Sequence, residues 1–145
     1  MVACASPRYL AQHGTPQTPE QLARHRRLAY SQSESPGDWT FIDLEGRQSA
    51  VEGVAALRSN NVQLLTTAAL QGAGVVYGPT FVFGDHLRTG ALVALLPDFS
   101  TSDLGVHAIY PSTRYLPTKV RRLIDQLVTE FGDNPPWDDL LRGTG

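Results

Sequence analysis

The chain has 145 residues, of which 41% are hydrophobic and 18% are charged, and its formal net charge is -2. This is the composition of one globular domain with a sizeable core, and the lack of a basic run argues against DNA binding by the chain itself. A single cysteine, Cys4, excludes a disulfide within the chain, and no apolar run is long enough to predict a membrane span. We therefore expect a cytoplasmic protein.

The first part of the chain predicts two strands and two short helices. An apolar run over 2–5 predicts a buried strand. Ser6, followed by a proline, is a typical helix start because serine accepts hydrogen bonds from first-turn amides, and Gly14 would end that helix. Thr18, again followed by proline, predicts a second helix start, and 28–30 predicts a second strand.

The following segment predicts a polar loop and then a hairpin. Residues 31–37 are rich in serine and end in a Pro-Gly pair, which is typical of a loop. A strand over 39–42 would place its aromatic side chains on one face. A turn at Gly46 and an extended segment over 50–58 complete the predicted hairpin.

The most informative part of the sequence is an α-to-β unit. A helix opens at Asn61 and ends at Gly72, and a short apolar strand over 75–77 follows directly. Units of this kind belong to open α/β sheets, and they place helix N-termini where backbone N–H groups can meet an anion. A helix over 80–87 and a strand over 91–96 continue the pattern.

The last predicted elements are a strand over 106–110 and an amphipathic helix between Pro117 and Gly132. The apolar residues of this helix recur at helical spacing: Val120, Leu123, Ile124, Leu127, Val128 and Phe131. Such a stripe must cover the sheet, pair with another copy or remain exposed, and exposed stripes drive association. We expect the chain to self-associate through residues 117–131. Together the elements predict an α/β fold with about five strands and helices on both faces.

Several short motifs follow one another over nearly the whole chain. They are 5–14, 39–41 ahead of Gly46, the helix from Asn60 leading into 72–76 and Pro79, 87–93, 108–111, and 116–125. Each motif alone is weak, but in this order they resemble the C-terminal effector-binding domain of LysR-type transcriptional regulators, over about residues 3–137.

The resemblance implies a type 2 periplasmic-binding-protein-like fold, with a mixed, mostly parallel sheet of about five strands flanked by helices and a C-terminal return helix. By the same resemblance, residues 1–109 correspond to effector-binding subdomain two, and 110–145 are a return strand and helix belonging to subdomain one. The family's winged helix-turn-helix and the rest of subdomain one have no counterpart here. We therefore expect a truncated chain, with DNA contacted only through the missing helix-turn-helix domain.

Reactive residues do not form a pattern that predicts catalysis, so we expect no catalytic residue, no metal and no cofactor. Cys4 lies in an apolar run, where a buried inert thiol is expected. Gly72-x-Gly74 lacks the third glycine of a dinucleotide-binding fingerprint. The histidines do not combine with a carboxylate or cysteine at metal-ligand spacing: His13, His25, His86 and His107.

The candidate ligand-binding residues come from strand ends and one helix start. They are Ser31, Gln32, Ser33, Trp39, Asn61, Tyr110 and Pro111. The serines and the glutamine could donate to a carboxylate or form a plain solvent loop, and Trp39 could wall a cleft or anchor the core. Asn61 could cap its helix, or the helix N-terminus at Asn61 could face an anionic ligand. Tyr110 and Pro111 enter only through the resemblance, because in the family this segment borders the effector cleft.

These observations predict the effector-sensing domain of a bacterial LysR-type DNA-binding regulator, which binds a small anionic metabolite and forms a homo-oligomer. Binding would shift the population of subdomain arrangements, and no chemical step is needed. The alternative is a fragment of a periplasmic solute-binding transport protein, and a sensor or synthase domain of an enzyme is a third. The sequence upstream in the parent gene discriminates the first two, since it would encode either a helix-turn-helix or a signal peptide.

Overall fold

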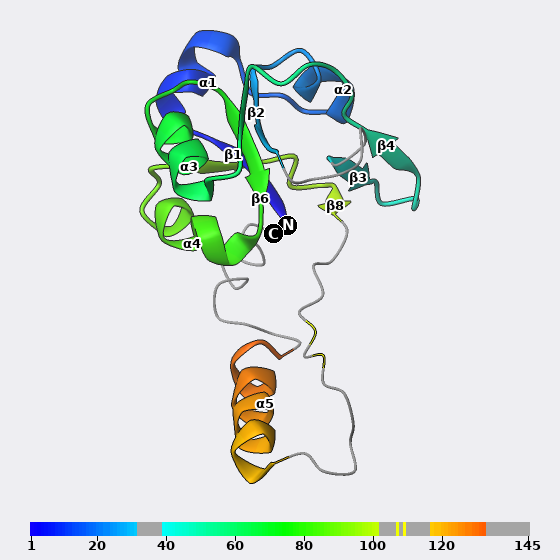
Figure 1. The fold of residues 1–145 in the computed structure, drawn as a ribbon. Coiled ribbons are helices and arrows are strands. Elements are labelled where there is room, and N and C mark those ends of the chain that lie inside the picture. Colours follow the sequence, from blue (N-terminus) through cyan, green and yellow to red (C-terminus); the bar gives the residue numbers. More distant parts are fainter. Residues whose placement is uncertain (32–38, 102–106, 108, 110–116, 133–145) are drawn as a thin grey trace.

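The computed structural model describes residues 1–31, 39–101, 107, 109 and 117–132, and it is organised around a five-stranded sheet (Figure 1). The strand order is β5-β2-β6-β1-β7. The strands are β1 (Val2–Ala5), β2 (Arg27–Tyr30), β5 (Leu57–Ser59), β6 (Val75–Gly78) and β7 (Val93–Leu95). β2 is parallel to both of its neighbours, but β1 is antiparallel to both of its own. The sheet is therefore mixed and mostly parallel, as expected: four of its strands run in the same direction and β1 alone opposes them.

Four helices in the first hundred residues begin as the sequence predicts. They are α1 (Pro7–His13), α2 (Pro19–Leu22), α3 (Val62–Leu70) and α4 (Thr80–Arg88). The side chains of Ser6, Thr18 and Asn61 accept hydrogen bonds from first-turn amides of α1, α2 and α3. α4 differs, because Pro79 occupies its N-cap position and provides no side-chain hydrogen bond.

Both faces of the sheet are covered, which confirms the expected layering. Successive residues of β1 point to opposite faces. Ala3 packs in a cluster with Tyr9 of α1, and Cys4 packs in a second cluster with Leu65 of α3 and Phe83 of α4. Burying each large side chain of these clusters contributes roughly 1.5–3 kcal/mol.

Two glycines allow the chain to turn sharply from α3 into β6. Gly72 has a φ of +80°, a conformation that other residues rarely adopt. A Cβ on Gly74 would lie 2.2 Å from the carbonyl oxygen of Arg26, so only glycine allows the two backbones to approach this closely. The sharp exit and close packing predicted for this unit are both present.

A second, three-stranded sheet has the order β4-β3-β8. Its strands are β3 (Thr40–Ile42), β4 (Gln48–Ala50) and β8 (Ser100–Thr101), all antiparallel. The expected hairpin exists, but its second strand is 48–50, not 50–58. The turn closes early because the Asp43 carboxylate accepts the backbone N–H groups of Glu45 and Arg47. β5, at the far end of the expected segment, instead pairs in parallel with β2 in the first sheet.

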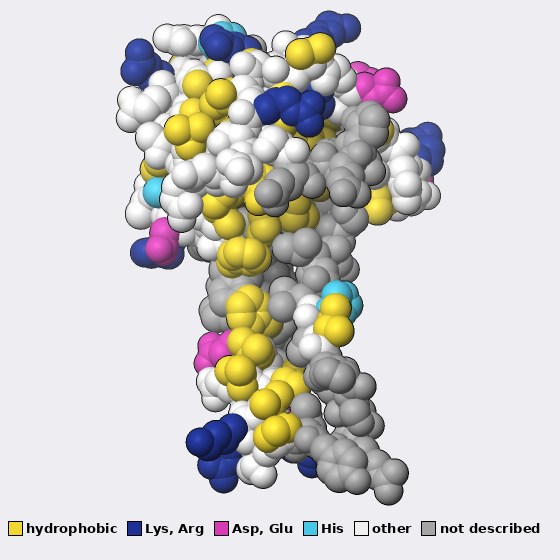
Figure 2. All heavy atoms as spheres, viewed as in Figure 1, with side chains coloured by type: hydrophobic (Ala, Val, Ile, Leu, Met, Phe, Trp, Pro, Cys, Tyr) yellow, Lys and Arg dark blue, Asp and Glu magenta, His cyan; other side chains and the backbone are white. Residues whose placement is uncertain are grey.

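The final helix is α5 (Thr118–Glu130), and its apolar stripe is exposed (Figures 1 and 2). None of its residues is buried, and Leu123 and Val128 are 59% and 65% exposed. The strand predicted over 106–110 lies largely outside the described residues. Of this range the structure describes only His107 and Ile109, and neither is in a strand. Within the described residues, no helix is long and apolar enough to cross a membrane.

Candidate ligand-binding site

A hollow of about 650 Å³ lies where β2 and β6 end and α3 and α4 begin. We call it the Trp39 pocket. Its lining residues are Met1, Ala29, Tyr30, Trp39, Asn60, Asn61, Val62, Gln63, Leu65, Val76, Tyr77, Gly78, Pro79 and Val82. None of these side chains is acidic or basic. The volume falls in the range of about 300–1,000 Å³ that is typical of small-molecule sites, and the ends of parallel strands are where α/β sheets hold ligands.

Stacked aromatic rings form one wall of the Trp39 pocket. The rings of Trp39 and Tyr77 stack with centroids 5.4 Å apart and planes inclined by 29°. Phe41, from the neighbouring strand β3, meets the Tyr77 ring edge-on at 5.7 Å. Trp39 is only 5% exposed, so it anchors the core and lines the pocket at once. The two roles considered for it are therefore compatible.

A buried cation, Arg27, lies behind this aromatic wall. Its guanidinium carbon is 5.5 Å from the centre of the Trp39 ring, and the residue is 7% exposed. The guanidinium donates to the backbone carbonyls of Val51 and Gly53, and within the described part of the chain no carboxylate forms an ion pair with it. Burial, and then the charge of Arg58, lower the pKa of Arg27. An arginine nevertheless stays charged, so this positive charge is held beside the pocket without an anionic partner.

Two helix N-termini meet the Trp39 pocket, and both helices have nine residues. The Asn61 side chain accepts from the backbone N–H of Leu64 at 3.1 Å, so it caps α3 as well as lining the pocket. That cap leaves the amides of Val62 and Gln63 without a protein acceptor in the described structure. α4 starts at Pro79, without a side-chain cap. Both helix dipoles therefore present their positive ends to the pocket.

The predicted site residues fall into three groups. Trp39 and Asn61 line the pocket together. Ser31 is not among the lining residues, although it directly follows Tyr30, which is; its backbone N–H donates to the carbonyl of Ser59 and extends the β2–β5 pairing. The others, Gln32, Ser33, Tyr110 and Pro111, lie outside the described residues.

Sequence reasoning missed Arg27 and Tyr77. A charged residue at the start of an apolar strand was the only signal for Arg27. Tyr77 was placed in a strand, but its contact with Trp39 depends on the packing of β6 beside the loop before β3.

The described residues that could take part in catalysis or metal binding do not form a reactive site. Cys4 is fully buried, and burial raises its pKa to about 12, which suppresses the reactive thiolate. Among the described residues, no three His, Cys, Asp or Glu side chains are grouped so as to hold a metal ion.

Comparison with known proteins identifies the family. The sequence matches the LysR substrate binding domain over residues 1–132. The chain belongs to this family. It is 34% identical over 134 residues to the HTH-type transcriptional regulator PtxR of Pseudomonas aeruginosa, and 33% identical over 132 residues to the HTH-type transcriptional regulator CrgA of Neisseria meningitidis serogroup B. These matches cover 92% and 90% of this chain but only 43% of each relative.

Solved structures agree with this assignment. The CrgA regulatory domain, from a LysR-type regulator of Neisseria meningitidis, superposes with a TM-score of 0.74 at 30% identity, covering 90% of this chain and 64% of that one. The regulatory domain of AphB in Vibrio vulnificus superposes with a TM-score of 0.67 at 26% identity, covering 88% and 63%. The LysR substrate-binding family and the periplasmic-binding-protein-like fold expected from the sequence are confirmed.

Proposed function

We propose that this chain is the effector-sensing part of a bacterial LysR-type transcription regulator and that it binds a small anionic metabolite in the Trp39 pocket. The observation that carries the proposal is the meeting of two helix N-termini at an uncharged hollow, backed by a buried arginine that has no carboxylate partner among the described residues. The family match and the helix-turn-helix regulators among its relatives support a role in transcription.

Electrostatics supports the proposal that the ligand is anionic. A helix N-terminus stabilises a nearby negative charge by about 0.3–1 kcal/mol when exposed, and by up to about 2 kcal/mol when partly buried. The charge of Arg27 acts in the same direction through a region of low dielectric constant. The apolar and aromatic lining would hold the uncharged body of the metabolite, since most small-molecule sites combine an apolar surface with a few polar groups.

Signalling by such a domain needs a ligand that binds one arrangement of the subdomains better than another. We propose that residues 1–109 form effector-binding subdomain two and that 110–145 return to subdomain one, so that a ligand in the Trp39 pocket would favour one arrangement. In the whole cytoplasmic regulator, DNA would be bound by a helix-turn-helix domain, as the names of the relatives indicate for them. The family match disfavours the alternative of a transport protein.

The stripe on α5 is exposed when the rest of subdomain one does not cover it, and we propose that in this state α5 pairs with α5 of a second copy in antiparallel orientation. The helix carries its basic residues, Lys119, Arg121 and Arg122, in its first half, and its acidic residues, Asp125 and Glu130, in its second (Figure 2). Antiparallel pairing brings unlike charges together, whereas parallel pairing brings like charges together.

The ligand proposal is tested by thermal-shift measurements with matched probes. Succinate and benzoate are compared with their neutral amides, because a ligand that binds the native state raises the melting temperature. We expect saturable stabilisation by at least one carboxylate and none by its amide. Asn61→Asp keeps a good helix cap but adds a negative charge to the lining, so it should abolish the effect.

The control is Thr18→Asp, which makes the same kind of cap substitution at α2, outside the pocket lining. It should leave the carboxylate effect intact. Equal stabilisation by acid and amide, or an effect that survives Asn61→Asp, would contradict the proposal.

A further inference from the structure

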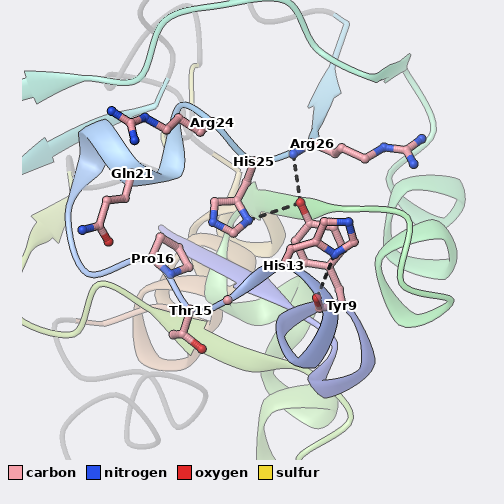
Figure 3. A pocket seen from close by; sticks show the side chains of 9 residues that line it. Tyr9, His13, Thr15, Pro16, Gln21, Arg24, His25 and Arg26 are labelled. Atoms are coloured by element: carbon pink, nitrogen blue, oxygen red, sulfur yellow. Dashed lines mark hydrogen bonds between the residues drawn. The ribbon is translucent and has the colours of Figure 1, made fainter.

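A second hollow, of about 400 Å³, lies between α1 and α2 and shares no residue with the Trp39 pocket (Figure 3). We call it the His25 pocket. Its lining residues are Tyr9, His13, Gly14, Thr15, Pro16, Gln21, Arg24, His25 and Arg26. Its lining includes two histidines and two arginines but no acidic residue, in a protein whose formal net charge is -2. The pocket is therefore a local concentration of basic groups.

The Tyr9 hydroxyl fixes the orientation of the His25 ring. Tyr9 is 1% exposed, and its oxygen accepts the backbone N–H of Arg26 at 2.9 Å. The hydroxyl proton is then available for the Nδ1 atom of His25, 3.2 Å away. In this arrangement the neutral His25 ring carries its own proton on Nε2. Figure 3 shows that edge of the ring turned away from Tyr9, on the side of the pocket where Pro16 and Gln21 lie.

His13 completes a layer of rings around Tyr9. Its ring stacks on that of Tyr9 with centroids 4.2 Å apart and planes inclined by 14°. Its Nδ1 atom lies 3.0 Å from the backbone oxygen of Tyr9, which can only accept, so His13 donates this bond. Both imidazoles are thus positioned by a buried, rigid tyrosine rather than by solvent. A ligand between them would meet a preorganised site.

The charges around His25 favour an anion. His25 contacts Tyr9 of α1, and it lines the pocket together with His13 of α1, Gln21 of α2, and its chain neighbours Arg24 and Arg26. In the described part of the protein, neither of these arginines forms an ion pair. Their side chains point away from His25 in Figure 3, so they contribute a positive field around the pocket rather than direct contacts within it.

We propose that the His25 pocket is a second binding site, for a small oxyanion or carboxylate that accepts a hydrogen bond from the Nε2–H group of His25. Burial, and then the charge of His13, lower the pKa of His25. A bound anion stabilises the protonated form of His25, so binding and protonation of His25 favour each other. The site therefore binds more tightly as the pH falls through the range in which His25 titrates.

Sulfate is the probe, because its charge is constant between pH 6 and pH 8. Histidine ring resonances of the full chain are followed by NMR during sulfate titration at constant ionic strength, with chloride as the replaced anion. We expect saturable shifts of the His13 and His25 resonances, with binding weaker at pH 8 than at pH 6 by up to about tenfold, the limit that a rise of one pKa unit on binding would set. Equal shifts with chloride, or an affinity independent of pH, would overturn the proposal.

Two variants separate this site from its surroundings. His25→Gln keeps an acceptor for the Tyr9 hydroxyl but removes the titrating ring, so sulfate should no longer shift His13. His86→Gln, on α4 and outside the pocket lining, should bind sulfate as the unchanged protein does. Asn61→Asp should also leave sulfate binding intact, which distinguishes failure here from failure at the Trp39 pocket. An equal loss of sulfate binding in His25→Gln and His86→Gln would contradict the assignment of the sulfate site to the His25 pocket.

Discussion

The guanidinium carbon of Arg27 lies 5.5 Å from the centre of the Trp39 ring. This contact joins the first residue of β2 to the aromatic wall of the Trp39 pocket. The same guanidinium holds the carbonyls of Val51 and Gly53, and the N–H of Val51 returns to the carbonyl of Trp39. One side chain therefore supports the pocket wall and supplies the charge behind it.

Arg27→Met tests this double role. The substitution leaves two carbonyls without their donor, so we expect a loss of about 1–3 kcal/mol in the free energy of unfolding. We also expect weaker binding of whichever carboxylate stabilises the unchanged protein. Urea denaturation and calorimetric titration measure the two effects. Arg88→Met, which removes an exposed arginine on α4, is the matched control and should change neither by more than about 0.5 kcal/mol.

The pH dependence of stability tests the His25 arrangement. Because the pKa of His25 is lowered in the folded state, the unfolded chain binds more protons as the pH falls through its ordinary value of about 6.5. The stabilising contribution of neutral His25 is therefore fully present above that value and is lost as the pH drops through it toward the lower folded pKa. Urea midpoints between pH 8 and pH 5 should fall more steeply for the unchanged protein than for His25→Gln. Parallel curves would show that His25 makes no such contribution.

Gly74→Ala should be among the most damaging small substitutions in the chain. The added Cβ would lie 2.2 Å from the backbone oxygen of Arg26, so the turn from α3 to β6 would have to move away from the start of β2. We expect a loss of several kcal/mol in the free energy of unfolding, which is exceptional for a single substitution. Gly90→Ala is the control, because its φ is +72° but nothing lies within 4 Å of the added Cβ. It should cost about 1 kcal/mol. Chemical denaturation of both variants measures the difference, and similar losses would refute the close approach.

Self-association through α5 is tested by exchanging charges. Lys119 and Glu130 lie about three helical turns apart, on one edge of the stripe, so antiparallel pairing sets each against the other. Lys119→Glu should weaken association by about two- to tenfold, and adding Glu130→Lys should restore it. Arg122→Glu, on the opposite face, is the control and should have little effect. Sedimentation analysis gives the association constants, and a monomer at every concentration would refute the pairing.

Sequence reasoning succeeded where one residue determines local structure. Ser6, Thr18 and Asn61 were placed as caps because a short polar side chain satisfies first-turn amides, and each makes that bond. Gly72 and Gly74 were placed at a tight exit for steric reasons that the structure bears out. Such features depend on a few neighbouring residues, so local chemistry is sufficient to predict them.

Features that depend on distant partners were not predictable in this way. β1 is antiparallel to β6 and β7, which lie far along the chain, so its direction could not be derived from its own four residues. Arg27 meets its carbonyl partners 24 and 26 residues away. His13 and His25 have no metal-ligand spacing in the sequence and were not expected to form a site, but Tyr9 brings them together. Among the residues around the Trp39 pocket, sequence reasoning had singled out Trp39 and Asn61 as candidates but not the cation behind them.

Fluorescence of Trp39 tests the central claim most directly. In a Trp137→Phe background, Trp39 is the single tryptophan, so its emission reports the pocket wall alone. Titration with succinate or benzoate should change this emission saturably for at least one of them, while the matching amide does not, and Asn61→Asp should abolish the change. An emission that stays constant with both acids, or changes equally in the Asn61→Asp variant, would contradict anion binding at the Trp39 pocket.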